Sequence, residues 1–300
     1  MPVSRPIWTL LVIAAVAAAP LAACGTTARP EGTAVRAGTA GQTGKAATGR
    51  FSAPVHIDNR MFPLMPGTEY VYQGKIVEGG ESKAHSVVFT VTGLTKVVGG
   101  VPTVVAWDRD FLEGQLQEQE LALFAQDDRG NLWNFGEYPE EYENGKFTGA
   151  PDTWIRGAGG AYGGIHMLAK PSAGVQYTEG RIRSIGFYDL SRVVSTSQAT
   201  CARPGCFQHV LVVDEWSPGN PGHQIKYYAP GVGLVRVGAR GGDSQEYLSL
   251  TAIRHLGRDR LARVAAGAMA MDRRAYRVSR LYRVTQPAAP GPGCPTPTWR

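Results

Sequence analysis

Two aspartates, Asp108 and Asp110, stand two residues apart in the segment AWDRDF. If this segment is a strand, side chains at positions i and i+2 point to the same face, so the two carboxylates lie together. Such a pair could divide the roles of general acid and general base, or bind a cation. The alternative is a solvated strand edge beside Arg109. Asp108 and Asp110 are therefore the candidate catalytic residues, with a purely solvated role kept open.

A second group of acidic residues lies in GEYPEEYENG, residues 136–145. Its members are Glu137, Glu140, Glu141 and Glu143. Hard cations such as calcium favour carboxylate oxygens, but the segment lacks the DxDxDG order of a calcium loop. We expect an acidic surface loop here.

The six histidines form no HxH, HExxH or HxxxH motif, and the sequence contains no GxSxG elbow. We therefore predict no metal site and no cofactor. Four aromatic residues could instead line a cavity for a small apolar or sugar ligand. These candidates for ligand binding are Trp107, Trp133, Trp154 and Tyr227. The alternative is that they are ordinary core residues.

Two of the four cysteines, Cys201 and Cys206, bracket a Pro-Gly turn in CARPGC. Such a turn can bring two Cα atoms within bridging distance. We expect a disulfide that closes this loop in an oxidising compartment. A metal-binding or redox pair is the alternative, although no second cysteine or histidine cluster lies nearby in sequence. Cys294 is left over in a proline-rich terminus, and its redox state is left open.

The amino terminus has the layout of an export signal. Arg5 precedes an apolar run of 13 residues, Ile7 to Ala19, which is broken only by Thr9. This run suits a signal-peptide core and is shorter than the roughly 20 residues of a membrane-spanning helix. Pro20 follows, and then Leu21-Ala22-Ala23-Cys24.

This last stretch resembles the lipobox of bacterial lipoproteins, which is an aliphatic residue, two small residues and a cysteine. The resemblance implies cleavage after residue 23, lipidation of Cys24, and anchoring at the extracytoplasmic face of the cell membrane. An ordinary secretory signal and a retained transmembrane anchor are the alternatives. Residues 24–50 lack apolar periodicity, so we expect a disordered linker with a span of roughly 28 Å.

Residues 51–256 alternate short β-branched and aromatic runs with turn signals, which predicts about ten strands. Short turns force neighbouring strands to run antiparallel. We expect a mainly β domain, in which an antiparallel meander forms a curved sheet, half-barrel or barrel. Within residues 257–284, an apolar residue recurs every three or four positions from Arg258 to Arg277, which predicts an amphipathic helix packed on the domain. Residues 285–300 are predicted to be a disordered, proline-rich tail.

Charge is unevenly distributed along the chain. Residues 24–253 carry 20 basic and 23 acidic side chains, a net charge of −3, whereas residues 254–300 carry ten arginines against two aspartates, a net charge of +8. The basic end could meet anionic lipid head groups, or it could simply be a solvated helix face. A nucleic-acid partner is not expected for an exported protein.

Three segments, FPLMPGTEYVYQG, AQDDRGNLWNFGEY and YYAPGVGLVRV, are similar to segments of a group of secreted bacterial proteins that have no assigned activity. This resemblance covers roughly residues 60–255. The meander also resembles the half-barrel carriers of lipoproteins and lipids, a likeness at the level of the fold only.

The sequence therefore favours a membrane-anchored extracytoplasmic lipoprotein that acts as a ligand-binding or envelope-associated β-scaffold rather than as an enzyme. One alternative is an envelope hydrolase that uses Asp108 and Asp110 on glycan or ester substrates. Another is an interacting subunit of an envelope assembly. The oligomeric state is left open.

Overall fold

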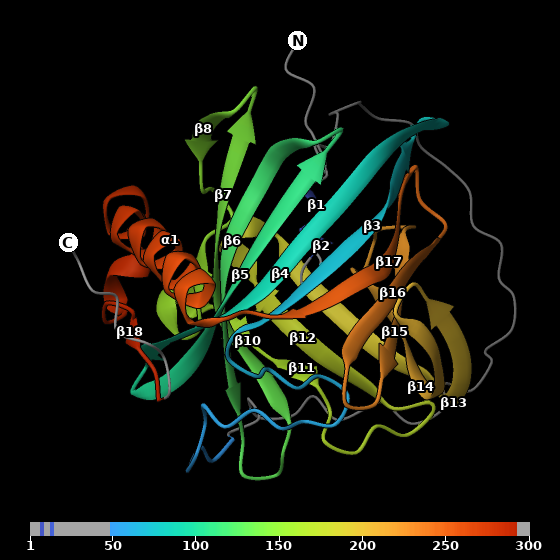
Figure 1. Ribbon diagram of the computed structural model, residues 1–300, viewed down its shortest axis with the longest axis horizontal. Helices are drawn as coiled ribbons and strands as arrows, with labels where there is room; N and C mark the ends of the chain where they lie inside the picture. The colour runs from blue at the N-terminus through green and yellow to red at the C-terminus, as the bar shows by residue number, and fades with distance from the viewer. Residues whose placement is uncertain (1–6, 9–12, 15–48, 293–300) are drawn as a thin grey trace, which may run out of the picture.

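The computed structural model describes residues 7–8, 13–14 and 49–292 (Figure 1). Two short strands, β1 (Ile7–Trp8) and β2 (Ile13–Ala14), pair antiparallel. Cys24, the predicted cleavage site and nearly all of the predicted linker lie outside the described residues. Within the described part of the chain, no helix combines the length and apolar character needed to cross a bilayer.

One antiparallel sheet of 16 strands makes up most of the described chain, which confirms the predicted mainly β class. Its first half is a meander of long strands, each paired with the next: β3 (Thr68–Glu78), β4 (Glu81–Val98), β5 (Val101–Leu112), β6 (Gln115–Gln126) and β7 (Leu132–Glu143). Short strands follow: β8 (Lys146–Gly149), β9 (Trp154–Ile155), β10 (Tyr162–Gly163) and β11 (Ile165–Met167). The second half is β12 (Gln176–Ile182), β13 (Phe187–Ala202), β14 (Gly205–Trp216), β15 (His223–Ala229), β16 (Gly233–Arg240) and β17 (Ser244–His255), with β18 (Ala289–Pro290) near the end.

The two ends of the sheet meet at residues 162–167, which we call the closing segment. Its first strand, β10, pairs with β12, and its second strand, β11, pairs with β7. Between them, the Gly164 N–H donates to the Glu179 carbonyl at 2.7 Å, and the Gly164 carbonyl accepts from Asn134 N–H at 3.1 Å. A Cβ at Gly163 would lie 2.2 Å from the Asn134 carbonyl oxygen. Glycine is therefore required where the ends of the sheet approach each other.

The curved sheet encloses one hydrophobic cluster on its inner face. Alternate residues of each strand point inward, as the pleat requires. The segment before β3 closes one end of this interior with four buried side chains, Ile57, Met61, Phe62 and Leu64. Phe62 contacts the rings of Phe89 and Tyr228, which come from opposite parts of the sheet. We call the curved sheet together with this apolar floor the β-cup.

The helix α1 (Arg258–Val278) covers the outer face of the first half of the sheet (Figure 1). The predicted helix and its apolar stripe are confirmed. The stripe is buried, and its residues are Leu261, Val264, Ala268, Met271 and Ala275. The helix also approaches the sheet closely, because a Cβ at Gly267 would lie 2.7 Å from the Trp107 ring.

Buried charges fasten this helix to the sheet. The Lys96 ammonium donates to Asp272 at 2.7 Å, to the Tyr276 hydroxyl at 2.8 Å and to the Gln286 carbonyl at 2.7 Å. The Tyr282 hydroxyl donates to the same carboxylate at 2.8 Å. We call this set the helix seam. It also includes the pair between Arg274 of α1 and Glu140 of β7, in which the Arg274 Nε–H donates at 2.6 Å.

Residues 285–291 differ from the disordered tail that we predicted. β18 pairs with Leu94 and Thr95 of β4, and the Ala288 N–H donates to Asp272 at 3.1 Å. The helix seam therefore holds this segment against the sheet, a contact that proline content alone does not reveal. The remainder of the predicted tail, residues 293–300, lies outside the described residues.

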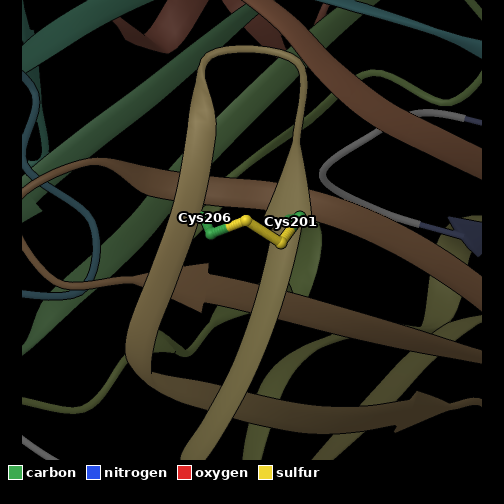
Figure 2. Close-up of a disulfide and its surroundings, with 2 residues drawn as sticks. All are labelled: Cys201 and Cys206. Atoms are coloured by element: carbon green, nitrogen blue, oxygen red, sulfur yellow. A yellow bond between two sulfur atoms is a disulfide. The ribbon is translucent and has the colours of Figure 1, made fainter.

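The predicted disulfide between Cys201 and Cys206 is present (Figure 2). The two cysteines face each other across the end of the hairpin formed by β13 and β14. The Arg203 N–H next to this hairpin end donates to the Leu250 carbonyl of β17 at 3.2 Å.

Candidate functional site

A layer of buried acidic side chains occupies the inner face of the sheet. We call it the inner acidic layer. Its carboxylic acids are Asp108, Asp110, Glu118, Glu120, Glu137, Glu179, Asp189, Glu215 and Glu246, each at most 7% exposed. The buried bases beside them are His85, His166 and Lys226. Acids therefore outnumber bases threefold within this interior.

The first half of the layer comes from the hairpin of β5 and β6. Strand register places Asp110 opposite Glu118 and Asp108 opposite Glu120. Side chains that face each other across an antiparallel pair have Cβ atoms about 5 Å apart. Four carboxyl groups are thus concentrated in two adjacent cross-strand pairs, and the shared face predicted for Asp108 and Asp110 is present.

His85 lies between two of these acids. Its Nε2 is 2.8 Å from Asp110 Oδ1, and its Nδ1 is 3.3 Å from Glu246 Oε1. Burial alone would lower the pKa of His85, but the hydrogen bond and charge of Asp110 outweigh it and raise the pKa. His85 can therefore carry a positive charge that offsets part of the acidic surplus.

The pKa values of the acids in the first half are all raised. Burial, assisted by the charge of Asp110, raises the pKa of Asp108 to about 7. Burial and the neighbouring carboxylates raise the pKa values of Glu118 and Glu120 well above the ordinary value. Like charges this close in a desolvated site cannot all be ionised together. The layer therefore retains protons at neutral pH.

The second half of the layer contains Lys226, which is the only lysine of the layer among the described residues. Lys226 pairs with Glu215, while Glu179 accepts from the Ser191 hydroxyl. Burial, together with the charge of Glu179, raises the pKa of Glu215 to about 7. Burial and the charge of Lys226 lower the pKa of His166 to about 4, so this imidazole is neutral.

Glu137 of β7 connects the two halves. It accepts from the indole N–H of Trp154 at 2.9 Å and from the amide of Asn134 at 2.5 Å. Burial nevertheless raises the pKa of Glu137 to about 8, and the charges of Asp189 and Glu179 add to the increase. The acidic surplus thus extends across the interior from β5 to β14.

Several oxygens in the layer lack partners. Neither carboxylate oxygen of Glu118, which is 4% exposed, has a hydrogen-bond partner among the described residues. Asp108, which is 2% exposed, makes no hydrogen bond to another side chain within residues 49–292. Buried polar groups are normally paired, because an unpaired one costs about 1–3 kcal/mol. The layer is therefore rich in acceptors that an N–H donor could satisfy.

The layer adjoins an apolar recess. This recess is small, with room for little more than one water molecule, and is lined mainly by Phe62, Leu64, Tyr70, Tyr72 and Phe89. Tyr72 belongs both to the recess and to the surroundings of Asp108, whose charge helps to raise the pKa of its hydroxyl after burial. Tyr72 thus places the apolar recess near the acidic acceptors.

The four candidate aromatic residues are not brought together. Trp107 packs against α1, and Trp133 lies in the cluster beneath the helix. Trp154 belongs instead to the inner cluster, where it stacks on Phe187, and Arg236 lies over the ring of Tyr227. These residues serve the cores on both faces of the sheet and do not line one shared cavity.

The expectation of an acidic surface loop at residues 136–145 is wrong for most of that segment. Residues up to Glu143 form β7, in which Glu137 faces the inner acidic layer and Glu140 faces the helix seam. Sequence reasoning missed both residues because charge was taken as a sign of exposure. Glu137 and Glu140 are three positions apart and so carry no alternating pattern, whereas Glu118 and Glu120 of the layer are two apart, which matches the period of a strand.

The fold and this site define a mainly β protein with a curved antiparallel sheet, an acidic interior and an external C-terminal helix. No protein-family model matches the chain, and no curated protein matches it. Solved structures that are similar to it in part include three whose identity, coverage and TM-score are as follows. We draw no functional argument from these likenesses.

The first is a protein described as exported, with a YmcC-like fold, from Bacteroides fragilis; it is 15% identical, covers 65% of this chain and 99% of its own, and has a TM-score of 0.38. The second is described as a lipoprotein from Parabacteroides distasonis. It is 13% identical, covers 65% of this chain and 99% of its own, and has a TM-score of 0.36. The third is a β-barrel-like domain of unknown function from Brucella abortus; it is 10% identical, covers 70% and 100%, and has a TM-score of 0.33.

Proposed function

We propose that the protein is an exported lipoprotein, anchored to the cell membrane through Cys24, whose β-cup binds a small organic cation at the inner acidic layer. The observation that carries the binding role is the surplus of buried carboxyl groups with unpaired oxygens, above all those of Asp108 and Glu118. A bound cation would supply the missing positive charge and hydrogen-bond donors. Because an unpaired charge is costly when it is buried, this compensation would stabilise the folded protein.

The anchor rests on the resemblance of Leu21-Ala22-Ala23-Cys24 to a lipobox. Diacylation of one cysteine holds a protein stably, because each buried methylene contributes about 0.8 kcal/mol. Radiolabelled palmitate fed to cells should therefore label the wild-type chain and leave the Cys24→Ala variant unlabelled. Equal labelling of both chains would contradict the anchor and leave the binding role to be judged separately.

An organic cation suits the layer better than a metal ion. Among the described residues, no group of three or more histidine, cysteine, aspartate or glutamate side chains is arranged to hold a metal. An amine needs no such shell, since its N–H groups can donate to carboxylates on different strands. The apolar side chains around Tyr72 offer a wall against which a short hydrocarbon body could pack. These features together favour a small alkylamine.

Thermal unfolding at pH 8 tests this proposal, because more carboxyl groups of the layer are ionised at pH 8 than at neutral pH. We would titrate spermidine, cadaverine, tetramethylammonium and calcium chloride against sodium chloride at equal ionic strength. A ligand at 100 times its Kd should add about 2.7 kcal/mol to the free energy of unfolding. We expect an amine to raise the unfolding temperature well above the sodium chloride control.

The matched variants are Asp108→Asn with Glu118→Gln in the layer, and Glu78→Gln with Glu81→Gln at an exposed turn. The layer variant should lose the amine-dependent increase, while the turn variant should keep it. A wild-type chain that responds to no amine more than to sodium chloride would contradict the proposal. So would a layer variant that responds as strongly as the wild type.

Hydrolysis is the second candidate function, and one observation favours it. A pKa of about 7 at Asp108 is close to the optimum for a general acid or base at neutral pH. Turnover of a panel of glycan and ester substrates, abolished by Asp108→Asn with the fold intact, would establish it in place of simple binding.

A further inference from the structure

The outward face of α1 and the segment just after it are rich in arginine, and Asp259 is the exposed acidic residue of the helix. Arg258, Arg263, Arg273, Arg277 and Arg280 are exposed and make no ion pair within residues 49–292. We call these five residues the basic face. By contrast, Arg260 pairs with Glu69 at 2.9 Å, and Arg274 pairs with Glu140. The helix thus uses some arginines for packing and leaves others directed to solvent.

The middle of this face is formed by small residues. Ala262, Ala266 and Ala270 recur every four positions on the side opposite the buried stripe. At 3.6 residues per turn, they run along the helix between Arg258 and Arg273, with Arg263 beside them. A helix with such a flat surface can approach a planar partner closely.

Apolar side chains are exposed among the arginines at the end of the helix. Val278 is 39% exposed and Val284 is 63% exposed. Val278 follows Arg277 in sequence, Val284 follows Arg283, and Arg280 lies between the two valines. Exposed valines among arginines are typical of a surface that rests at the boundary between water and lipid, where apolar groups enter and basic groups meet head groups.

The charge distribution and the position of the domain's first residues agree with this assignment. Residues 254–300 carry a net charge of +8 against −3 for residues 24–253. Phe51, close to the start of the domain, packs on Trp133 and Phe135 in the cluster beneath the helix. The first residues of the domain therefore pack in the same outer cluster as α1.

We infer that the basic face docks on an anionic lipid surface and so sets the orientation of the β-cup on the membrane. This inference does not depend on the ligand of the inner acidic layer. Each arginine near an anionic bilayer strengthens binding about fivefold, so loss of three should weaken vesicle binding on the order of a hundredfold. The attraction should fall with salt because it is screened.

The test uses residues 24–300 with Cys24→Ser, so that no acyl chain contributes. Co-sedimentation would be measured with vesicles of phosphatidylcholine alone and of phosphatidylcholine with phosphatidylglycerol at 3:1. The variant carries Arg273→Gln, Arg277→Gln and Arg280→Gln. Its control carries Arg129→Gln, Arg183→Gln and Arg203→Gln, which removes three exposed arginines of turns elsewhere.

We expect the unsubstituted chain and the control to bind the anionic vesicles in low salt, to bind neutral vesicles weakly, and to be released by 0.5 M sodium chloride. The helix variant should bind about a hundredfold more weakly, with its unfolding temperature unchanged. Equal weakening in the control would overturn the inference, since it would show attraction by net charge only. Failure of the unsubstituted chain to bind anionic vesicles would overturn it as well.

Discussion

Two buried charged regions lie on opposite faces of the same strands, and they differ in how their charges are matched. In the helix seam, the Lys96 ammonium is 2.7 Å from Asp272 and Arg274 pairs with Glu140. In the inner acidic layer, acids outnumber bases threefold, and Glu118 has no hydrogen-bond partner in the described chain. Matched charges specify how α1 packs, whereas unmatched charges lower stability. The seam therefore has a structural role, whereas the layer is the site of the proposed ligand binding.

The largest expected effect is the dependence of stability on pH. Burial raises the pKa of Asp108, Glu215 and Glu246 to about 7 and that of Glu137 to about 8. The folded state therefore binds more protons than the unfolded state, and stability falls as pH rises through these values. Each group alone accounts for about 2–3 kcal/mol of loss between pH 5 and pH 8.

The histidines modify this profile in opposite directions. The pKa of His85 is raised, so the stability that its protonated form contributes is also lost as pH rises. His166, whose pKa is lowered to about 4, opposes the trend because it must remain neutral in the folded state. Allowing for shared protons, we expect the free energy of unfolding in urea to fall by about 5 kcal/mol from pH 5 to pH 8. A flat or rising profile would remove the distinction between the two regions.

The next largest effect is expected in the helix seam. Lys96→Met leaves Asp272 buried without its cation, which should cost about 3–5 kcal/mol in the free energy of unfolding. The exposed Lys170→Met provides a control and should stay within about 0.5 kcal/mol of the wild type. If Lys96→Met lowers the free energy of unfolding by less than about 1 kcal/mol in urea titrations, the helix seam does not stabilise the packing of α1 on the sheet.

Neutralising one acid of the layer should act in the opposite direction. Asp108→Asn removes a carboxylate whose ionisation opposes folding, so we expect a gain of about 2–3 kcal/mol at pH 8 and a smaller one at pH 5. Equilibrium unfolding at the two pH values measures both. A loss of stability at pH 8 would mean that the charge of Asp108 is compensated within the fold.

The smallest effect serves as a check that the pH profile belongs to the layer. Opening the short loop between Cys201 and Cys206 with a double serine substitution should cost about 2 kcal/mol. The pH profile of that variant should remain parallel to that of the wild type. A changed slope would show that the hairpin and the layer are coupled.

The sequence allowed the fold class, the C-terminal helix and the disulfide to be predicted, because each depends on local periodicity or on a short turn. The shared face of Asp108 and Asp110 followed in the same way. The inner acidic layer could not be predicted as a whole. Its members, such as Glu137 and Glu215, come from strands whose pairing with distant partners decides which face is inside.

Charge was also a misleading guide to exposure. Glu140 looked like part of a surface loop, yet it is buried because Arg274, 134 positions away, reaches it. Lys96 is fully buried for the same kind of reason, with its partner on a helix near the other end of the chain. Partners at such separations leave no mark on the local sequence pattern.

The closing segment has a mechanical consequence for access to the interior. The two halves of the sheet are joined there by strands of only two and three residues, whereas neighbours elsewhere share ladders of up to 11 register pairs. Parting the wall at Gly163 and Gly164 breaks only a few hydrogen bonds, so we expect opening of the sheet at this line to cost little. A side chain at either glycine would collide with the backbone of the facing strand, so we expect such a substitution to loosen the closure of the sheet and expose the interior to solvent.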